Sequence, residues 1–145
     1  RDRLRSRGLG DVYKRQHKMK NVEFLGFKSG AELENVIKGA RFTLIPSIWY
    51  DNLPNTALES FQYSKPVIAS NIGSLPELVI DGENGYLFKP SNVEDLIKKI
   101  KMLDEDTLVK KMGQASRKRL ESRFAPQTHY EDLMKIFNEA VKSRK

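Results

Sequence analysis

A junction at residues 45–60 constrains the fold more than any other stretch, because three kinds of local structure follow one another there. Ile45 ends an apolar segment typical of a buried strand, a short polar loop follows, and Pro54 stands near the start of a helical pattern, where proline is favoured. In an open α/β sheet such a junction lies at the carboxyl edge of the strands. The free N–H groups and the positive end of the helix dipole can hold a phosphate at that edge.

Two acids flank this junction, with seven residues between them. We expect Asp51 in the loop beside the helix start and Glu59 about one turn or more inside the helix, so both can face a ligand lying across the helix start. Each acid also has a simpler interpretation. Glu59 fits an ordinary helix-surface position, and Asp51 fits a turn or a helix cap.

Three further side chains near the carboxyl edge have two interpretations each. Trp49 and Tyr50 can stack on a base or a sugar, although packing against the neighbouring strand is the interpretation we favour. Glu77 lies three residues after Ser74, which is the capping-box spacing. We therefore interpret Glu77 as a capping acid and not as a ligand.

From residue 21 onward, the first half of the sequence alternates between apolar runs typical of strands and apolar spacings typical of helices. We expect strands at 22–25, 41–45 and 66–69, a helix that opens with the capping-box pattern at 29–32, and a helix at 54–64. The order strand, helix, strand, helix, strand predicts a parallel sheet with right-handed crossovers. The predicted fold class is α/β, a Rossmann-like parallel sheet flanked by helices.

The second half continues with short elements and three amphipathic helices. The expected elements are a short helix from Ser74, a turn at 81–85, a strand at 86–88, a helix opened by the capping-box pattern at 91–94, and helices at 106–121 and 126–141. The apolar face of the helix opened at 91–94 consists of Leu96, Ile97, Ile100 and Leu103. The last helix carries an apolar stripe that we expect to be partly exposed, which predicts aggregation or dimerisation.

The helix at 106–121 also carries a basic face, formed by Lys110, Lys111, Arg117, Lys118 and Arg119. A run of charge on a helix is usually its solvated side, and that is the interpretation we favour. Contact with an anionic membrane surface is the alternative.

Composition excludes several classes of site. The chain has 145 residues, is 39% hydrophobic and has no cysteine, which fits one domain and removes disulfides and thiolate chemistry. His17 and His129 are too far apart in the sequence to indicate a zinc site, so we expect no metal. Because there is no membrane-spanning apolar run and no signal-peptide pattern, we expect a cytoplasmic location, with peripheral contact at the inner face of the membrane left open.

The net charge of +7 is concentrated at one end of the chain. Six basic and two acidic residues give residues 1–16 a charge of +4, which leaves +3 for the remainder. Residues 11–16 resemble the translation of a transposon adapter used in sequencing libraries, so we interpret 1–16 as a non-native tail and 17–145 as the domain. A nucleic-acid-binding arm is the rival interpretation, and we expect no nucleic-acid partner.

Seven segments, read in order, resemble the C-terminal nucleotide-sugar-binding domain of a family 4 retaining glycosyltransferase of the GT-B type, over residues 21–142. Any one segment is weak, whereas their order and spacing are specific. The segments are residues 21–26, 46–47, 51–60 (DNLPNTALES), 65–70 (KPVIAS), 72–73, 76–77 and 81–90 (DGENGYLFKP).

This resemblance implies a role for each acid. In the family, two glutamates separated by seven residues bind the donor, the first at the sugar and the second at the ribose hydroxyls. By position, Asp51 is then the donor-sugar ligand and Glu59 the ribose ligand, since a carboxylate can accept two hydrogen bonds from a vicinal diol. Asp51 departs from the usual glutamate and has a shorter side chain.

Backbone groups complete the implied donor site. The resemblance implies diphosphate binding by the N–H groups at Leu53, Asn55 and Thr56. It implies that the backbone at Phe27 and Lys28 contacts the base.

The sequence departs from the family pattern at two small residues and lacks two larger features. Ser74 replaces the second of two paired glycines, and Ser64 replaces a glycine before Lys65-Pro66. The Arg and Lys that face the leaving diphosphate, and the N-terminal acceptor domain, have no counterpart in this chain. Catalytic residues are therefore unknown and expected in that absent part.

The implied activity of the intact enzyme is transfer of a hexose from a nucleoside diphosphate sugar to an acceptor hydroxyl with retention, in glycan or polysaccharide synthesis. The resemblance implies no cofactor or metal, because the helix dipole and basic side chains replace the metal. We expect this chain alone to bind nucleotide weakly or not at all and to be inactive. A non-catalytic nucleotide-binding or interaction module of the same fold is the alternative, because fold does not fix function.

Overall fold

The computed structural model describes residues 21–143, so the prediction that residues 1–16 form a non-native tail lies outside the described residues. The chain divides into two compact units, residues 1–36 and residues 37–145. Helix α2 (Gly30–Gly39) runs across this division. Each unit is described by itself.

The described part of the first unit contains irregular backbone followed by the start of α2. The strand predicted at residues 22–25 is wrong, because this segment forms no β-ladder and Phe24 and Leu25 are exposed. A strand needs a neighbouring strand to accept and donate its backbone hydrogen bonds, and none pairs with this segment among the described residues. The predicted helix start is confirmed, since α2 begins directly after Ser29 and Lys28 pairs with Glu32 at 3.4 Å.

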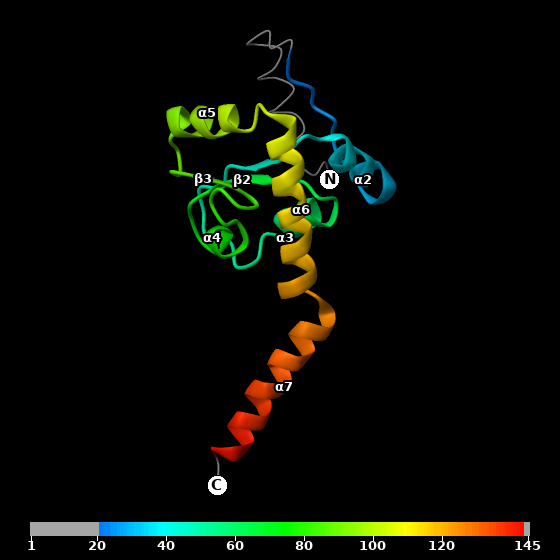
Figure 1. Cartoon of the computed structure of the whole chain (residues 1–145), viewed down its shortest axis with the longest axis vertical. Helices are drawn as coiled ribbons and strands as arrows, with labels where there is room; N and C mark the ends of the chain where they lie inside the picture. Colours follow the sequence, from blue (N-terminus) through cyan, green and yellow to red (C-terminus); the bar gives the residue numbers. More distant parts are fainter. Residues whose placement is uncertain (1–20, 144–145) are drawn as a thin grey trace, which may run out of the picture. The chain divides into compact units, whose positions relative to one another are not determined.

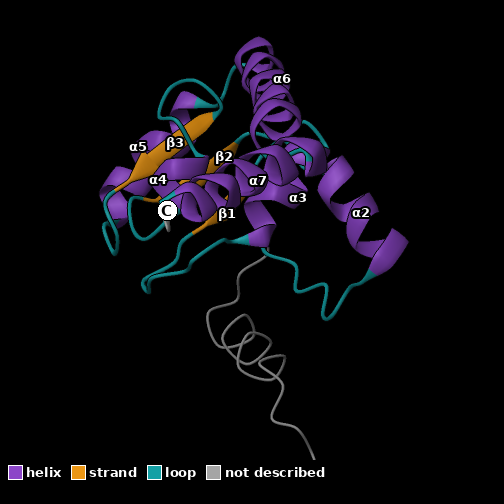
Figure 2. Ribbon diagram, turned by 90° about the horizontal axis from the view of Figure 1, so that it is seen from below, coloured by secondary structure: helices purple, strands orange, loops and turns teal. Residues whose placement is uncertain are grey.

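The second unit is built on a parallel sheet. Within residues 21–143 this sheet contains β1 (Thr43–Ile45), β2 (Val67–Ser70) and β3 (Gly85–Phe88), in that spatial order. The register aligns Thr43 with Val67 and Val67 with Gly85. Figure 2 shows the strands side by side with helices around them. The predicted α/β class with a parallel sheet is therefore confirmed.

The helices of this unit follow the predicted order (Figure 1). They are α3 (Asn55–Gln62), α4 (Leu75–Leu78), α5 (Val93–Met102), α6 (Asp106–Arg123) and α7 (Pro126–Lys142). Helix α3 packs against α6 and against β1 and β2. In contrast, α7 contacts α6 and has no buried residue, so the expectation of a partly exposed apolar stripe is confirmed by Tyr130, Leu133, Phe137 and Val141.

The core lies on both faces of β2, all four of whose residues are buried. Val67 and Ala69 belong to one cluster with Phe61 of α3, whereas Ile68 belongs to a second cluster with Met112 of α6. Alternate strand residues point to opposite faces, so a central parallel strand that is covered on both faces forms a nearly continuous apolar run, here Val67, Ile68 and Ala69. The apolar run at 66–69 is therefore explained by packing on both faces of the sheet.

Two glycines permit close backbone approach in this core. A Cβ atom at Gly85 would collide with the carbonyl of Val67 on the neighbouring strand. At Gly113 of α6 a Cβ atom would collide with the carbonyl of Ser64, just after α3. Ser64 itself has a φ of 53°, so the serine that replaces the family's glycine adopts a backbone conformation that glycine favours.

The predicted capping boxes hold only in part. Helix α5 is capped by Asn92, whose Oδ1 accepts from the backbone N–H of Asp95 at 2.9 Å, so the prediction at 91–94 is one residue early. The Ser74 side chain makes no cap bond to α4, and the interpretation of Glu77 as a capping-box partner is wrong. On α5, Ile97 is exposed and does not share the buried face of Leu96 and Ile100.

The basic face of α6 is only partly solvated. Arg117 Nη1 donates to the carbonyl of Gln62, the last residue of α3, at 2.7 Å. Arg119 Nε donates to the carbonyl of Leu78, the last residue of α4, at 2.9 Å. Both guanidinium groups thus bind carbonyl groups at helix ends, where the dipole favours a cation. The interpretation of this whole face as solvated is therefore wrong for these two arginines.

Candidate functional site

The candidate site lies at the carboxyl edge of β1 and β2. Residues 46–54 connect β1 to α3, and residues 71–74 connect β2 to α4. Because β1 and β2 are parallel, both connections leave the sheet at the same edge. This placement was predicted from the order of strands and helices.

Direct contacts join the two connections at Asp51. Ser74 Oγ donates to the carbonyl of Asp51 at 2.8 Å, and the Ser74 N–H points to the same oxygen at 3.3 Å. Gly73 has a φ of 59°, and a Cβ atom there would lie 3.1 Å from the Asp51 nitrogen. The serine that departs from the family's paired glycines therefore anchors the backbone of the predicted donor-sugar ligand.

The start of α3 has unsatisfied N–H groups. Pro54 occupies the N-cap position and provides no side-chain hydrogen bond. Among the described residues nothing accepts from the N–H groups of Leu53, Asn55 and Thr56, whereas the N–H of Ala57 donates to the carbonyl of Pro54 at 2.9 Å. A helix start without a cap leaves its donors and its positive dipole end available to an anion.

Buried hydroxyl groups fix α3 against β1. Thr43 Oγ1 donates to Ser60 Oγ at 2.8 Å, and Ser60 Oγ donates to the carbonyl of Thr56 at 2.6 Å. Ser60 is fully buried, whereas the adjacent Glu59 is exposed. The strand thus sets the rotation of the helix, and this rotation points Glu59 outward.

Within residues 21–143, neither of the two predicted acids has a cationic partner. Asp51 is half-buried and Glu59 is exposed, and neither side chain forms a hydrogen bond or ion pair with another described residue. No lysine, arginine or histidine occurs between residues 42 and 64. The junction therefore offers two free carboxylates beside free N–H donors.

The predicted base contacts belong to the other unit. Phe27 is exposed, and the Lys28 side chain pairs with Glu32. Phe27 and Lys28 belong to the first unit, whereas Asp51 and Glu59 belong to the second, so the role of Phe27 and Lys28 at the base stays a prediction.

The aromatic residues of the loop are not packing residues. Trp49 is 61% exposed and Tyr50 is 83% exposed, so the interpretation that they pack against the neighbouring strand is wrong. The chain instead buries Ser47 and Pro54 at the two ends of the connection. Both aromatic rings are available to a ligand.

Sequence reasoning missed Ser70, the last residue of β2. Its Oγ is buried and has no hydrogen-bond partner within residues 21–143. A buried hydroxyl without a partner is unfavourable unless a ligand or water satisfies it. The only sequence signal was a polar residue ending an apolar strand directly before a glycine-containing loop.

Residues 21–143 contain neither a metal-binding cluster of side chains nor a membrane-spanning helix. No group of three or more histidine, cysteine, aspartate or glutamate side chains is placed to hold a metal ion there. Over the same residues, no helix combines the length and apolar character needed to cross a bilayer.

Comparison with known proteins gives the family. The model for glycosyl transferases group 1 matches residues 13–119, which is most of the chain. The chain belongs to the group 1 glycosyl transferases. This confirms the predicted family and, with the likeness to solved glycosyltransferase structures, the predicted GT-B type of fold.

Relatives of this glycosyl transferase chain are longer proteins. An uncharacterised glycosyltransferase of Methanocaldococcus jannaschii is 31% identical over 139 residues, covering 91% of this chain and 39% of the relative. Glycogen synthase of Mycobacterium tuberculosis is 32% identical over 121 residues, covering 83% of this chain and 29% of the relative. The chain thus spans about two fifths or less of these relatives.

A solved structure shows the same fold. The crystal structure of HepE from Anabaena in complex with UDP superimposes with a TM-score of 0.76 at 24% identity. The match covers 91% of this glycosyl transferase chain and 38% of HepE.

Proposed function

We propose that the β1–α3 junction binds the diphosphate and ribose of a nucleoside diphosphate sugar, and that the chain is the C-terminal donor-binding domain of a retaining hexosyltransferase. The observation that carries this proposal is the uncapped start of α3, where the N–H groups of Leu53, Asn55 and Thr56 have no acceptor among the described residues. Free carboxylates at Asp51 and Glu59 flank these donors.

Each group has a distinct task in the proposed site. The N–H groups and the helix dipole stabilise the diphosphate as negative charge develops on its departure. Glu59 accepts hydrogen bonds from the two ribose hydroxyls, and Asp51 accepts from a hydroxyl of the hexose. Asp51 and Glu59 do not compete with the diphosphate for the N–H groups, because the proposed partners of these two acids are neutral hydroxyl groups.

The relatives support the donor class and the type of product. HepE was crystallised with UDP and with UDP-glucose. One relative is a glycogen synthase, which supports a role in polysaccharide synthesis. We extend the proposal to retention at the anomeric carbon from the family resemblance, and to a cytoplasmic location because nucleotide sugars are donors made there. Turnover by this chain alone is not expected.

Thermal unfolding in the presence of UDP tests the proposal. If the dissociation constant is about 1 mM, UDP at about 10 mM adds about 1.4 kcal/mol of stability and raises Tm by about 5 °C. We expect Glu59→Ala to abolish this rise, because the ribose loses its acceptor.

Glu83→Ala is the matched control, since Glu83 is an exposed glutamate in the turn before β3. This control should retain the full rise in Tm. Unchanged protection in Glu59→Ala would exclude the ribose role, and absence of protection in the unmodified chain would favour the alternative of an interaction module.

A further inference from the structure

The loop between β1 and α3 exposes an unusual amount of apolar surface. Within residues 46–54, Ile48 is 64% exposed and Leu53 is 50% exposed, in addition to the exposed rings of Trp49 and Tyr50. Single exposed apolar residues are common, but four in one short loop form a patch of the kind that marks binding sites.

This patch is held in place at both ends. Ser47 and Pro54 are buried on either side of it. Between them, the carbonyl of Asp51 accepts the Ser74 hydroxyl hydrogen bond at 2.8 Å. The rings of Trp49 and Tyr50 therefore project from a backbone that is anchored within a few residues on each side.

The charges around the patch restrict what it can bind. Asp51 and Glu59 are the only charged residues between positions 42 and 64, and both are acidic. No cationic side chain in this stretch can hold an anionic lipid headgroup or a nucleic-acid phosphate, so such ligands would be repelled wherever they meet the carboxylates and not the N–H groups at the start of α3. A neutral ligand with many hydroxyl groups would not be.

A pyranose ring matches this combination of groups. The C–H groups on one face of a sugar ring pack on an aromatic face, while its hydroxyls donate to carboxylates and exchange hydrogen bonds with amides. The loop supplies aromatic faces at Trp49 and Tyr50, a carboxylate at Asp51 and an exposed amide at Asn52.

We propose that Trp49 and Tyr50 form a platform that binds a pyranose ring of the acceptor saccharide beside Asp51. This proposal rests on the proposed function, which assigns the donor hexose to Asp51. An acceptor ring on the adjacent residues would place its hydroxyl next to the donor sugar, so the platform positions the acceptor for transfer.

Trp49 is the only tryptophan in the chain, so its fluorescence reports directly on the platform. The probes are three neutral tetrasaccharides (maltotetraose, mannotetraose and chitotetraose), UDP-glucose, UDP, and vesicles containing phosphatidylglycerol. We expect at least one tetrasaccharide to change the emission saturably. Tyr50→Ala should weaken that binding roughly fivefold, which corresponds to the loss of about one aromatic contact.

Tyr130→Ala is the matched control, because Tyr130 is also an exposed tyrosine and lies on α7, away from the loop in the sequence. This variant should bind the tetrasaccharide with unchanged affinity. Circular dichroism of Tyr50→Ala checks that the fold is retained, as expected for a side chain that is 83% exposed.

Three results would overturn the proposal. A response to UDP-glucose but to neither UDP nor any tetrasaccharide would assign the platform to the donor hexose. A response only to phosphatidylglycerol vesicles would assign it to a membrane. No response to any probe would show that the patch is not a saccharide site. Failure of the proposed function can be told apart from failure of this proposal. If only the proposed function fails, UDP gives no Glu59-dependent rise in Tm, but a tetrasaccharide still changes the Trp49 emission.

Discussion

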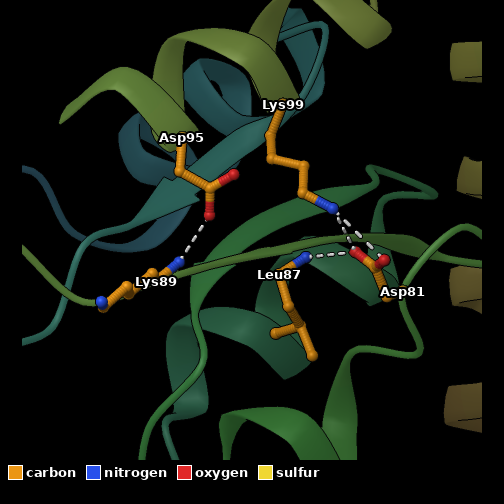
Figure 3. Close-up of polar contacts among 5 residues, drawn as sticks. All are labelled: Asp81, Leu87, Lys89, Asp95 and Lys99. Atoms are coloured by element: carbon orange, nitrogen blue, oxygen red, sulfur yellow. Dashed lines mark hydrogen bonds and ion pairs between the residues drawn. The ribbon is translucent and has the colours of Figure 1, made fainter. Parts of the chain in front are cut away.

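The polar groups around the two outer strands of the sheet, β1 and β3, differ in whether they are paired within the chain. Around β3 the groups are paired: Asp81 Oδ1 accepts from the N–H of Leu87 at 2.7 Å, Lys99 Nζ lies 3.1 Å from the same oxygen, and Asp95 accepts from the N–H of Lys89 at 2.8 Å (Figure 3). We call these five residues the β3 network. At the β1–α3 junction, Asp51, Glu59 and the N–H groups at the helix start have no such partners among the described residues.

This difference in pairing indicates that the region around β3 contributes to stability and that the β1–α3 junction contributes to ligand binding. Groups that are paired within the chain contribute to folding and have little capacity left for a ligand. Groups left unpaired at an anchored loop contribute little to folding and keep that capacity. We therefore expect substitutions near β3 to alter the free energy of unfolding and substitutions at the junction to alter ligand binding.

Gly85→Ala should have the largest effect on stability. The added Cβ collides with the Val67 carbonyl, so β2 and β3 must separate. We expect a loss of about 3 kcal/mol in the free energy of unfolding, measured with urea. Gly39→Ala is the control, because nothing lies within 4 Å of its Cβ position, and it should be neutral or slightly stabilising. Equal stability of the two variants would contradict the close approach at β3.

Asn84→Ala should have the next largest effect. Asn84 is fully buried, and its side chain accepts from the N–H of Ile80 at 2.7 Å and donates to the carbonyl of Leu78 at 3.1 Å. Truncation leaves the buried N–H of Ile80 without its acceptor and removes one of the two donors to the Leu78 carbonyl, which keeps its bond from Arg119, so we expect a loss of about 2 kcal/mol. Asn71→Ala, at an exposed asparagine, should lose less than about 0.5 kcal/mol. Similar urea midpoints for the two variants would refute the structural role of Asn84.

Asp81→Ala should have a smaller effect, because Asp81 is partly exposed and its ion pair with Lys99 is screened by water. Asp81→Ala also removes the acceptor of the Leu87 N–H. We therefore expect a total loss of about 1 kcal/mol in the free energy of unfolding. Lys99→Met removes this ion pair and the cation–π contact with Tyr86 but keeps the acceptor for Leu87, so it should lose about 0.5 kcal/mol. If Lys99→Met were the more damaging variant, the backbone contact would not be the main contribution of Asp81.

Tyr50→Ala should have the smallest effect on stability. The ring is exposed, so we expect a change within about 0.5 kcal/mol. Urea unfolding of this variant beside the unmodified chain measures the change. A loss as large as that of Asn84→Ala would show that the loop contributes to the core. It would contradict the distinction between the β1–α3 junction and the β3 network.

The sequence predicted the features that depend on local patterns. The parallel sheet, the order of the helices and the meeting of two loops at one edge followed from apolar runs, proline and the strand–helix alternation. The strand expected at 22–25 failed because pairing is not local: an apolar run becomes a strand only where another strand meets it.

The site was predictable in part for the same reason. The position of Asp51 and Glu59 at the junction follows from spacing along the chain. The anchoring of Asp51 by Ser74, the exposure of Trp49 and the unpaired hydroxyl of Ser70 depend on contacts between segments that are distant in the sequence. Likewise, the arginines of α6 were interpreted as solvated because their carbonyl partners lie on other helices.

The most direct test of the account is a map of the backbone amides that respond to UDP. We would titrate the isotopically labelled chain with UDP and record amide chemical shifts by NMR spectroscopy. We predict saturable shifts at the amides of Leu53, Asn55, Thr56 and Glu59, with the amides of residues 81–99 unchanged. Shifts centred on the β3 network, or no saturable shift at the start of α3, would contradict it.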